Sequence, residues 1–255
     1  MTRRALIIGG PGDPTVESSY LKGVLVDMLE YKRFFLSPCG GFWRETEIRE
    51  LLRPSVSDVR QELISLADFD YSFIAFSGHG YFSSQTQSTI LSLRKNVDFD
   101  SNELRLGGTR RTIVLDCCRE ILPPQLLEKR AESLQFAAEP DQRQPDAARC
   151  RRTFEERVDA ASAGLVVMHS CSRSETSGED EQIGGYYTSS LLSFAEDWIK
   201  TVAAERWSNT VYVLSTVEDH YAAVPRTKKL SGGRQNPTIE RPKTLSSYFP
   251  FAVFA

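Results

Sequence analysis

The sequence predicts an α/β fold in which a mostly parallel sheet lies between layers of helices. Four short runs are apolar almost without interruption, which is typical of strands buried on both faces. They lie at residues 5–8, 71–76, 112–115 and 164–168. Segments with the apolar spacing of helices lie between them. Because strand, helix and strand recur in this order, one sheet with helices on its faces is expected.

The first predicted strand, Ala5–Ile8, is followed by the first predicted helix. The apolar residues of this helix recur at the spacing of one helix face. They are Leu21, Val24, Leu25, Met28 and Leu29. A further short strand is expected at Phe34–Leu36. A second helix is expected to begin at residues 54–55, which hold Pro and Ser, and to continue to about residue 66.

One stretch after the third predicted strand differs from the rest of the chain. Residues 125–136 have helical spacing, and residues 139–157 are polar, with two prolines and charges of both signs. We expect a helix and then a mobile insertion at about 137–160, within a single domain that spans residues 1–255. Later helices are expected at 187–202 and 211–221, and a last short strand at 249–254.

Composition and charge exclude several classes of protein. With 40% hydrophobic residues, 10% aromatic residues and a formal net charge of −3, the chain is neither mainly disordered nor a general binder of nucleic acid. No apolar stretch approaches the roughly 18 residues of a membrane span, and glycine and proline follow the start too early for a signal peptide. A cytoplasmic protein without a membrane or nucleic-acid partner is expected. The five cysteines show no CxxC pair, so neither a disulfide framework nor a metal site is indicated.

His79 is the best-placed candidate for a catalytic base among the three histidines. It stands in a Ser-Gly-His-Gly motif at 77–80, directly after a buried run, where parallel strands of open sheets carry their sites. The flanking glycines let the backbone turn and approach a substrate closely. His169 and His220 are better explained as structural side chains.

A second motif, Asp116-Cys117-Cys118-Arg119, follows the run at 112–115 directly. Two strand ends therefore bring an imidazole and a thiol to the same edge of one sheet. A neighbouring imidazole that accepts the thiol proton makes the sulfur a nucleophile. Paired cysteines alone could equally be small buried hydrophobic residues. The two motifs together favour a nucleophile and its base.

In this order and setting the chain resembles the caspase and metacaspase cysteine peptidases. In that family His-Gly and Asp-x-Cys motifs end two adjacent strands, as FIAFSGHG and IVLDCCR do here, with Cys118 39 positions after His79. RALIIGG, Leu21-x-Gly23 with Asp27, and SCSRSETSGE followed by GYYT extend the resemblance over nearly the whole chain. The resemblance implies a caspase-like three-layer sandwich with a mostly parallel sheet of about six strands.

Carried over residue by residue, the resemblance makes Cys118 the nucleophile and His79 the general base, with no third member evident. The backbone amides of Gly80 and Cys118 would form the oxyanion hole. Ser77 and Asp116 match the residues that line the primary pocket of metacaspases, so cleavage after arginine or lysine is expected. Asp116 could instead cap the following helix. Cys117 would point away from the site, because consecutive side chains of a strand leave on opposite faces.

The resemblance also implies how the enzyme is regulated. The polar insertion lies where proteolytic activation occurs in the family, so a cut by the chain itself or by an upstream protease is expected to complete the pocket. The candidate cleavage sites are Arg143, Arg149, Arg151 and Arg152. The aspartates that bind activating calcium in many metacaspases have no convincing counterpart, so no metal and no cofactor are expected. The substrate would be a protein or peptide, in a prokaryotic stress or antiviral pathway.

Three other interpretations stay open at this point. A caspase-like scaffold could bind a partner peptide without cutting it, although both His79 and Cys118 are present. A pocket of the caspase kind would select acidic residues, and Arg119 matches the Cys-Arg step of caspases. Residues 9–12, Gly-Gly-Pro-Gly, could form a nucleotide-binding turn, but Pro11 removes an amide donor and the Lys-Ser/Thr step is missing.

Overall fold

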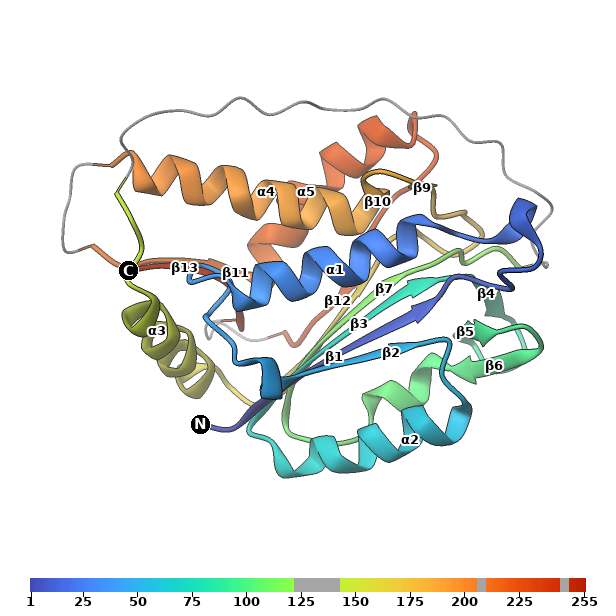
Figure 1. Ribbon diagram of the computed structural model, residues 1–255, viewed down its shortest axis with the longest axis horizontal. Helices are drawn as coiled ribbons and strands as arrows, with labels where there is room; N and C mark the ends of the chain where they lie inside the picture. Colours follow the sequence, from blue (N-terminus) through green and yellow to red (C-terminus); the bar gives the residue numbers. More distant parts are fainter. Residues whose placement is uncertain (122–142, 206–209, 244–247) are drawn as a thin grey trace.

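The computed structural model describes residues 1–121, 143–205, 210–243 and 248–255 (Figure 1). Its centre is a six-stranded sheet in the order β12-β8-β7-β3-β1-β2. The strands are β1 (Arg3–Gly10), β2 (Ile48–Leu52), β3 (Tyr71–Gly78), β7 (Arg110–Asp116), β8 (Gly164–His169) and β12 (Thr238–Glu240). All neighbours are parallel except β12, which pairs antiparallel with β8. The mostly parallel sheet predicted from the four apolar runs is confirmed.

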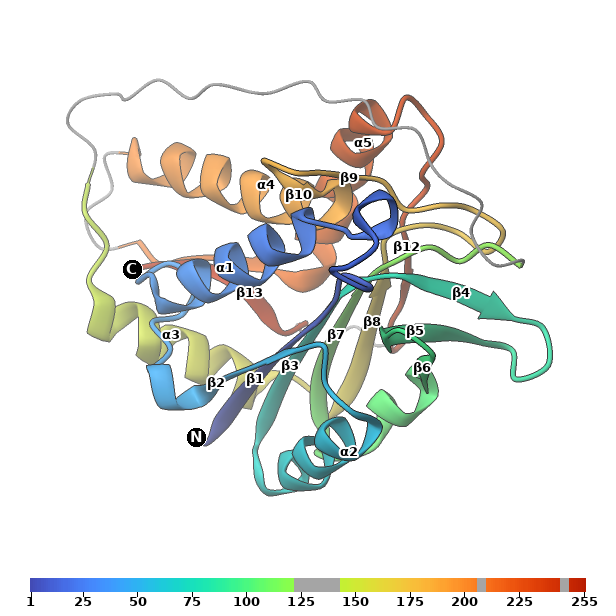
Figure 2. The same cartoon turned by 45° about the vertical axis from the view of Figure 1, so that its right-hand side comes forward.

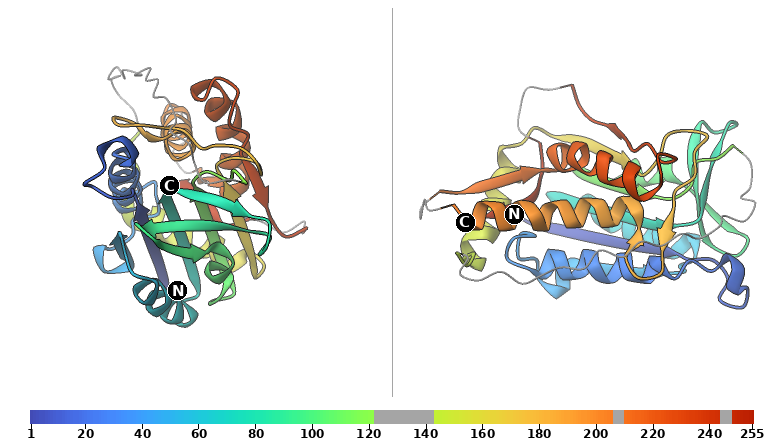
Figure 3. Two further views of the ribbon diagram at one scale, coloured as in Figure 1. Left: turned by 90° about the vertical axis from the view of Figure 1, so that its right-hand side faces the viewer. Right: turned by 90° about the horizontal axis from the view of Figure 1, so that it is seen from above.

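Helices cover both faces of this sheet, which gives three layers (Figure 2). The α-helices are α1 (Gly23–Leu36), α2 (Val56–Ser65), α3 (Ala147–Ala160), α4 (Tyr186–Ala203) and α5 (Thr216–Leu230). Short 3₁₀ turns are η1 (Glu17–Ser19), η2 (Glu45–Glu47), η3 (Leu66–Asp68) and η4 (Ser101–Arg105). Seen from above, α1, α4 and α5 lie side by side over one face (Figure 3), while α2 covers the other. None of the helices in the described ranges has the length and apolar character needed to cross a membrane.

Three small antiparallel sheets are attached to this framework. The first contains β4 (Gly80–Ser83), β5 (Ser88–Arg94) and β6 (Val97–Asp100), the second β9 (Glu179–Asp180) and β10 (Gly184–Gly185), and the third β11 (Tyr212–Ser215) and β13 (Pro250–Phe254). The expected last strand is therefore present, but it pairs with β11 rather than with the central sheet. The first small sheet follows β3 directly and stands at the carboxyl edge of the central sheet (Figure 2).

Alternation along the strands divides the core into two clusters, one on each face of the sheet. In β1, Ala5 and Ile7 pack in the cluster under α1, α3 and α4, whereas Leu6 and Ile8 pack with α2 and β5. All four are buried. The same alternation at the end of β7 sends Asp116 toward α1 and α4 and Cys117 into the opposite cluster. The alternation of side chains along each strand thus determines which side chains at the strand ends can come into contact.

The structure corrects the predicted course of the first helix. Phe34–Leu36 is not a strand but the last turn of α1. Leu25 and Leu29, placed on the buried stripe, are 42% and 62% exposed. The buried face runs instead through Val24, Asp27, Met28 and Tyr31 and continues at Phe34 and Phe35. The prediction was wrong because a buried aspartate interrupts the apolar pattern, which shifts the apparent stripe by one residue.

Two further predictions of secondary structure need correction, and one is confirmed. The segment 211–221 is the strand β11 followed by α5, whose N-cap Ser215 accepts a hydrogen bond from Glu218. The polar insertion is not a loop from residue 147 onward, because α3 occupies 147–160. The predicted helix at 125–136 lies outside the described residues. The second predicted helix is α2, with Ser55 as its N-cap.

The helix α3 is amphipathic, but the polar composition of its segment did not predict a helix. Cys150, Phe154 and Val158 recur every four residues and are buried against the core, while the charged residues between them face outward. Asp146 caps the helix by accepting a hydrogen bond from Arg149 N at 2.8 Å. A narrow apolar stripe is enough to hold the helix on the core, so the charge content of the segment did not indicate disorder.

Candidate active site

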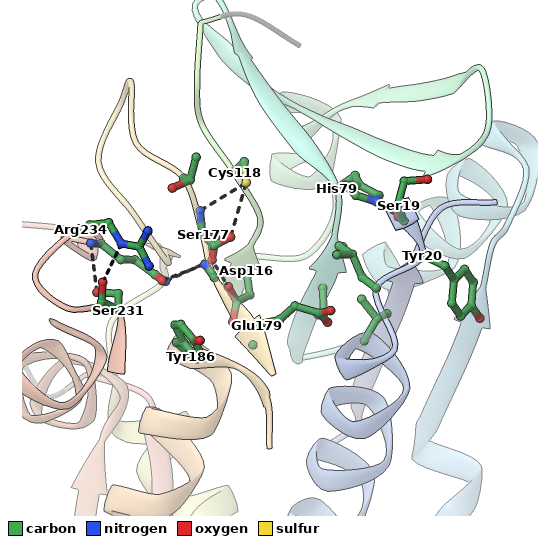
Figure 4. Close-up of a pocket in the computed structure, with 18 of the residues that line it drawn as sticks. Ser19, Tyr20, His79, Asp116, Cys118, Ser177, Glu179, Tyr186, Ser231 and Arg234 are labelled. Carbon is green, nitrogen blue, oxygen red and sulfur yellow. Dashed lines mark hydrogen bonds between the residues drawn. The ribbon is translucent and has the colours of Figure 1, made fainter. Parts of the chain in front are cut away.

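A pocket of about 180 Å³ opens at the carboxyl edge of the central sheet (Figure 4). Its walls come from the segment before α1, the ends of β3 and β7, the chain between β8 and α4, and the segment after α5. His79, Cys118, Ser77 and Asp116 all line it. The structure therefore brings the imidazole, the thiol and the pocket carboxyl predicted from the sequence into one cavity.

Backbone groups hold His79 from two sides. Its N–H donates to Gly10 O at 3.1 Å, and Nε2 lies 2.6 Å from Ser19 O. Because a carbonyl oxygen only accepts hydrogen bonds, Nε2 carries the proton and Nδ1 keeps its lone pair. The contact with Ser19 thus selects the tautomer in which Nδ1 is basic. Sequence reasoning missed Ser19, since a backbone carbonyl leaves no residue-type signal.

The glycine before His79 permits a close approach of two strands. Gly78 has φ of 152°, and a Cβ there would lie 2.3 Å from Gly10 O. Gly12, with φ of 96°, passes beside the imidazole, where a Cβ would lie 3.1 Å from His79 Nε2. The Gly-Gly-Pro-Gly turn at 9–12 packs against the imidazole, and its Gly10 carbonyl accepts the His79 amide. Through these contacts the turn supports His79.

The Cys118 thiol faces the opposite wall of the pocket. Ser177 N–H donates to Sγ at 3.3 Å, and the thiol donates to Ser177 O at 3.5 Å. Figure 4 shows Cys118 beside Ser177, with His79 and Ser19 across the pocket. Burial, which leaves Cys118 9% exposed, raises the pKa of its thiol to about 11. Among the described residues, no hydrogen bond joins Cys118 to His79, so the resting thiol is neutral.

Cys117 is separated from the pocket by the pleat of β7. It is 1% exposed and packs in the cluster on the α2 face. A Cβ at Gly80 would lie 2.9 Å from Cys117 Sγ, so this thiol supports the start of β4 from below. Burial raises its pKa well above the ordinary value. Cys117 and Cys118 thus face different surroundings, as strand alternation predicted.

Two buried carboxyl groups lie beneath the pocket. Asp116 accepts hydrogen bonds from Ser177 Oγ at 2.6 Å and from Thr188 N and Oγ1, both at 2.9 Å. Asp27 accepts a short hydrogen bond from Ser77 Oγ and one from Gly185 N at 2.9 Å. Burial raises the pKa of both groups, and the charge of Asp116 raises that of Asp27 further.

Gly185 separates these two acids. A Cβ at this position would lie 2.4 Å from Asp116 Oδ2 and 3.1 Å from Asp27 Oδ2. Within the described ranges, neither acid is paired with an arginine or lysine. Asp27 was part of the resemblance but was not predicted to lie in the site. Its signal was a carboxylate among the apolar residues that form the buried face of α1.

Side chains of the wall itself and of the segment after α5 hold the wall that carries Ser177. Glu175 accepts hydrogen bonds from Ser172 N at 3.1 Å and from Asn236 N and Nδ2 at 2.9 and 2.7 Å. The side-chain amide of Gln235 forms hydrogen bonds to the same stretch of chain from the side of α5. Its NH₂ group donates and its oxygen accepts. Neither Gln235 nor Glu175 was predicted from the sequence, because their partners lie up to 65 residues away.

Arg119 points away from the pocket. Arg119 is 6% exposed, and its guanidinium donates to Thr89 Oγ1 at 3.1 Å and Cys171 O at 3.2 Å. Its backbone pairs with Glu175 O and Ser174 N. Arg119 therefore joins the strand end that carries Cys118 to the chain after β8, and it does not line the pocket.

The candidate cleavage sites lie outside the pocket. Arg149, Arg151 and Arg152 belong to α3, and Arg151 pairs with Glu47 and, at 3.0 Å, with Glu155. The expected mobile loop around these three arginines is therefore wrong. Arg143 precedes the helix, and its backbone N–H donates to Ala203 O at 3.4 Å.

The remaining histidines and Asp98 have structural partners. His169 is buried with Nε2 3.2 Å from Glu240, and His220 Nδ1 lies 2.6 Å from the Tyr187 hydroxyl. Asp98, in β6, accepts hydrogen bonds from Tyr81 and Ser92. In the described part of the chain, no three side chains of metal-binding type are grouped as a metal site would require.

Comparison with protein-family models identifies the family of the chain. A family model described as a caspase domain matches residues 2–249, which include every segment that lines the pocket. No curated protein matches the chain.

Proposed function

The chain belongs to the caspase-domain family of cysteine peptidases, and from this premise we propose that it cleaves peptide bonds after arginine or lysine with Cys118 and His79. One observation carries the proposal: a thiol and an imidazole share a pocket whose base holds two buried carboxyl groups. A cationic side chain that entered this pocket would place its charge beside Asp116, while an acidic side chain would be repelled.

Geometry supports His79 as the base. Nδ1 accepts the proton of the Cys118 thiol as the sulfur attacks the scissile carbonyl carbon and the C–S bond forms. His79 then donates this proton to the amine as the C–N bond breaks, and a water deprotonated by His79 hydrolyses the thioester. The Ser19 carbonyl keeps Nε2 protonated and stabilises the imidazolium that forms between these steps.

The resting thiol needs this base. At a pKa of about 11, only about one Cys118 in ten thousand is ionised at pH 7. Before attack, the thiol must leave its hydrogen bond to Ser177 and turn toward the imidazole. The backbone amides of Gly80 and Cys118 would then stabilise the oxyanion, each contributing about 3 kcal/mol.

Asp116 supports specificity for basic residues. Asp116 accepts three hydrogen bonds from Ser177 and Thr188, all of which favour its charged form. The net charge of this carboxylate is what attracts a guanidinium or ammonium group. Glu179 adds a second acid to the pocket lining. Because Arg119 is buried behind the site, it gives no support to selection of acidic residues.

Activation follows from the position of the thiol. We propose that activation frees Cys118 from Ser177, and that a cut between the nucleophile strand and β8 is one way to do so. Of the four candidate arginines, Arg143 is the one that precedes α3 and needs no unwinding of a helix. A prokaryotic stress or antiviral setting stays a prediction from the resemblance.

A panel of fluorogenic peptides tests the proposal. Peptides that end in Arg, Lys or Asp before the fluorophore are incubated with the wild type, Cys118→Ala and the matched control Cys117→Ala. We expect turnover of the Arg and Lys peptides, its loss in Cys118→Ala, and its retention in folded Cys117→Ala. Turnover of the Asp peptide alone would overturn the specificity, and equal activity of Cys118→Ala would overturn the nucleophile.

A further inference from the structure

A buried glutamine outside the reacting groups is bound to the wall of the pocket. Gln235 lies between α5 and β12 and is 0% exposed. Its Nε2 donates to Ser170 O at 2.9 Å and to Ser177 Oγ at 3.1 Å, and its Oε1 accepts from Gly178 N at 3.0 Å. All three side-chain bonds go to one stretch of chain, the segment after β8.

The direction of these hydrogen bonds is fixed by chemistry. An amide NH₂ group only donates, so Ser177 Oγ is the acceptor in its bond with Gln235. A hydroxyl has one proton, and that of Ser177 is donated to Asp116 Oδ1 at 2.6 Å. Gln235, Ser177 and Asp116 therefore form a chain in which every proton points toward the carboxylate. A hydrogen bond donated to a carboxylate favours its charged form.

Asp116 depends on such donors because most of its titratable neighbours are neutral or acidic. These neighbours come from α1, α4, β9, the strand ends around the pocket and the segment after α5. The neutral or acidic ones are Asp27, Tyr31, Tyr187, Glu179 and Cys171, whereas His79 and Arg234 line the same pocket as groups that can carry positive charge. Burial is the main effect on the pKa of Asp116, and it raises this pKa, which favours the neutral carboxyl group.

We propose that Gln235 is a positioning residue for substrate specificity, which acts through Ser177 to hold Asp116 as the negatively charged partner of a basic side chain. Gln235 then sets the lower limit of the pH range in which the pocket binds arginine or lysine. This inference rests on the proposed function, and it adds a residue 119 positions from Asp116 to the specificity of the site.

The neighbouring residue provides a matched control. Asn236 holds the same stretch of chain through Glu175, with Nδ2 2.7 Å from Glu175 Oε1. This contact does not include Ser177 Oγ or Asp116. Asn236→Ala therefore loosens the wall without interrupting the proton chain, whereas Gln235→Leu interrupts it. Ser177→Ala interrupts the chain at its second member and keeps the backbone contacts with Cys118.

The test is the pH dependence of kcat/KM for an arginine peptide in these variants. We expect the acid limb to move up by about one pH unit in Ser177→Ala, the amount that corresponds to one charge-assisted hydrogen bond. In Gln235→Leu, which keeps the bond from Ser177 to Asp116 but removes the donor behind it, the limb should move in the same direction by a smaller amount. The double variant should move no further than Ser177→Ala. Asn236→Ala should lower kcat/KM by the same factor at every pH. If Gln235→Leu does not give a cooperative thermal transition, Ser177→Ala decides.

A second measurement separates this inference from the proposed function. The ¹³C shift of the Asp116 carboxyl, assigned by its absence in Asp116→Asn, is followed against pH in each variant. An acid limb and a carboxyl titration that stay at the wild-type pH in Gln235→Leu and Ser177→Ala would overturn the role of Gln235. If the wild type cleaves no basic peptide, the proposed function fails, and the carboxyl titration alone supports or overturns the chain from Gln235 to Asp116.

Discussion

The two walls of the pocket are built in different ways. On the His79 wall, backbone atoms make the contacts: Gly10 O, Ser19 O and the glycine at 78 fix the imidazole beside the central sheet. On the Ser177 wall, side chains from the segment after α5 hold a long connection in place. Backbone contacts survive most substitutions, whereas a side-chain network fails when one member changes. Substitutions should therefore seldom disturb the position of His79, whereas a single substitution on the Ser177 wall should alter that wall.

Removal of the imidazole tests the first wall most directly. We expect His79→Ala to lower kcat/KM for an arginine peptide by about 10³-fold, because among the described residues His79 is the one histidine that lines the pocket. His169→Gln, which removes a histidine buried beside Glu240, serves as the control and should keep activity. Steady-state kinetics on folded samples measure both. A drop of less than tenfold in His79→Ala would mean that another group on the Ser177 wall accepts the proton.

The reactivity of Cys118 shows which wall holds the resting thiol. Its pKa of about 11 predicts alkylation by iodoacetamide about a hundredfold slower at pH 7 than for a free thiol, with a rate that rises as pH approaches 11. His79→Ala should leave this rate unchanged, since the resting thiol bonds to Ser177. Mass spectrometry of the labelled peptide gives the rate, with Cys118→Ala as background. Fast labelling at pH 7 that requires His79 would instead assign the thiol to the histidine wall.

Gly78→Ala probes the close backbone contact of the His79 wall. A Cβ there would lie 2.3 Å from Gly10 O, so two strands must separate in addition to the strain at a φ of 152°. We expect a loss of about 3 kcal/mol in the free energy of unfolding, measured by denaturant titration. Gly232→Ala, where φ is 61° and an added Cβ would meet no atom of another described segment within 4 Å, isolates the backbone strain and should cost about 1 kcal/mol. Equal losses in the two variants would contradict the close contact.

Glu175→Gln probes the side-chain network of the Ser177 wall. One carboxylate oxygen accepts from Ser172 N and Asn236 N, and an amide NH₂ at that place would face two donors. We expect kcat/KM to fall about fivefold and the free energy of unfolding by about 1 kcal/mol. The exposed Glu156→Gln is the control and should change neither quantity. An unchanged kcat/KM in folded Glu175→Gln would show that the wall tolerates loss of this anchor.

Those parts of the fold that follow local pattern could be predicted from the sequence. Buried strands such as Tyr71–Gly78 read as continuous apolar runs, and the motifs that follow β3 and β7 indicated the thiol and the imidazole. The helix α3 was missed because its apolar stripe is narrow among many charges. The last turn of α1 was missed because Asp27 breaks the apolar spacing of the helix.

Residues that act through tertiary contacts left no such pattern. Gln235 is 58 residues from Ser177, and no periodicity or motif links the two. Ser19 acts through its carbonyl, an atom that every residue has. Arg119 was considered for its charge near the site, while in the fold its guanidinium binds Thr89 and the Cys171 carbonyl. Pairings of this kind depend on which loops the sheet brings together.

The absence of a side chain at Gly185 limits which substitutions this part of the protein can accept. A methyl group at this position would lie 2.4 Å from Asp116 Oδ2, which is too close, and 3.1 Å from Asp27 Oδ2, which would have to shift slightly. A larger residue at position 185 therefore requires that Asp116 moves or is replaced by a smaller residue. Substitutions at these two positions are thus linked by sterics.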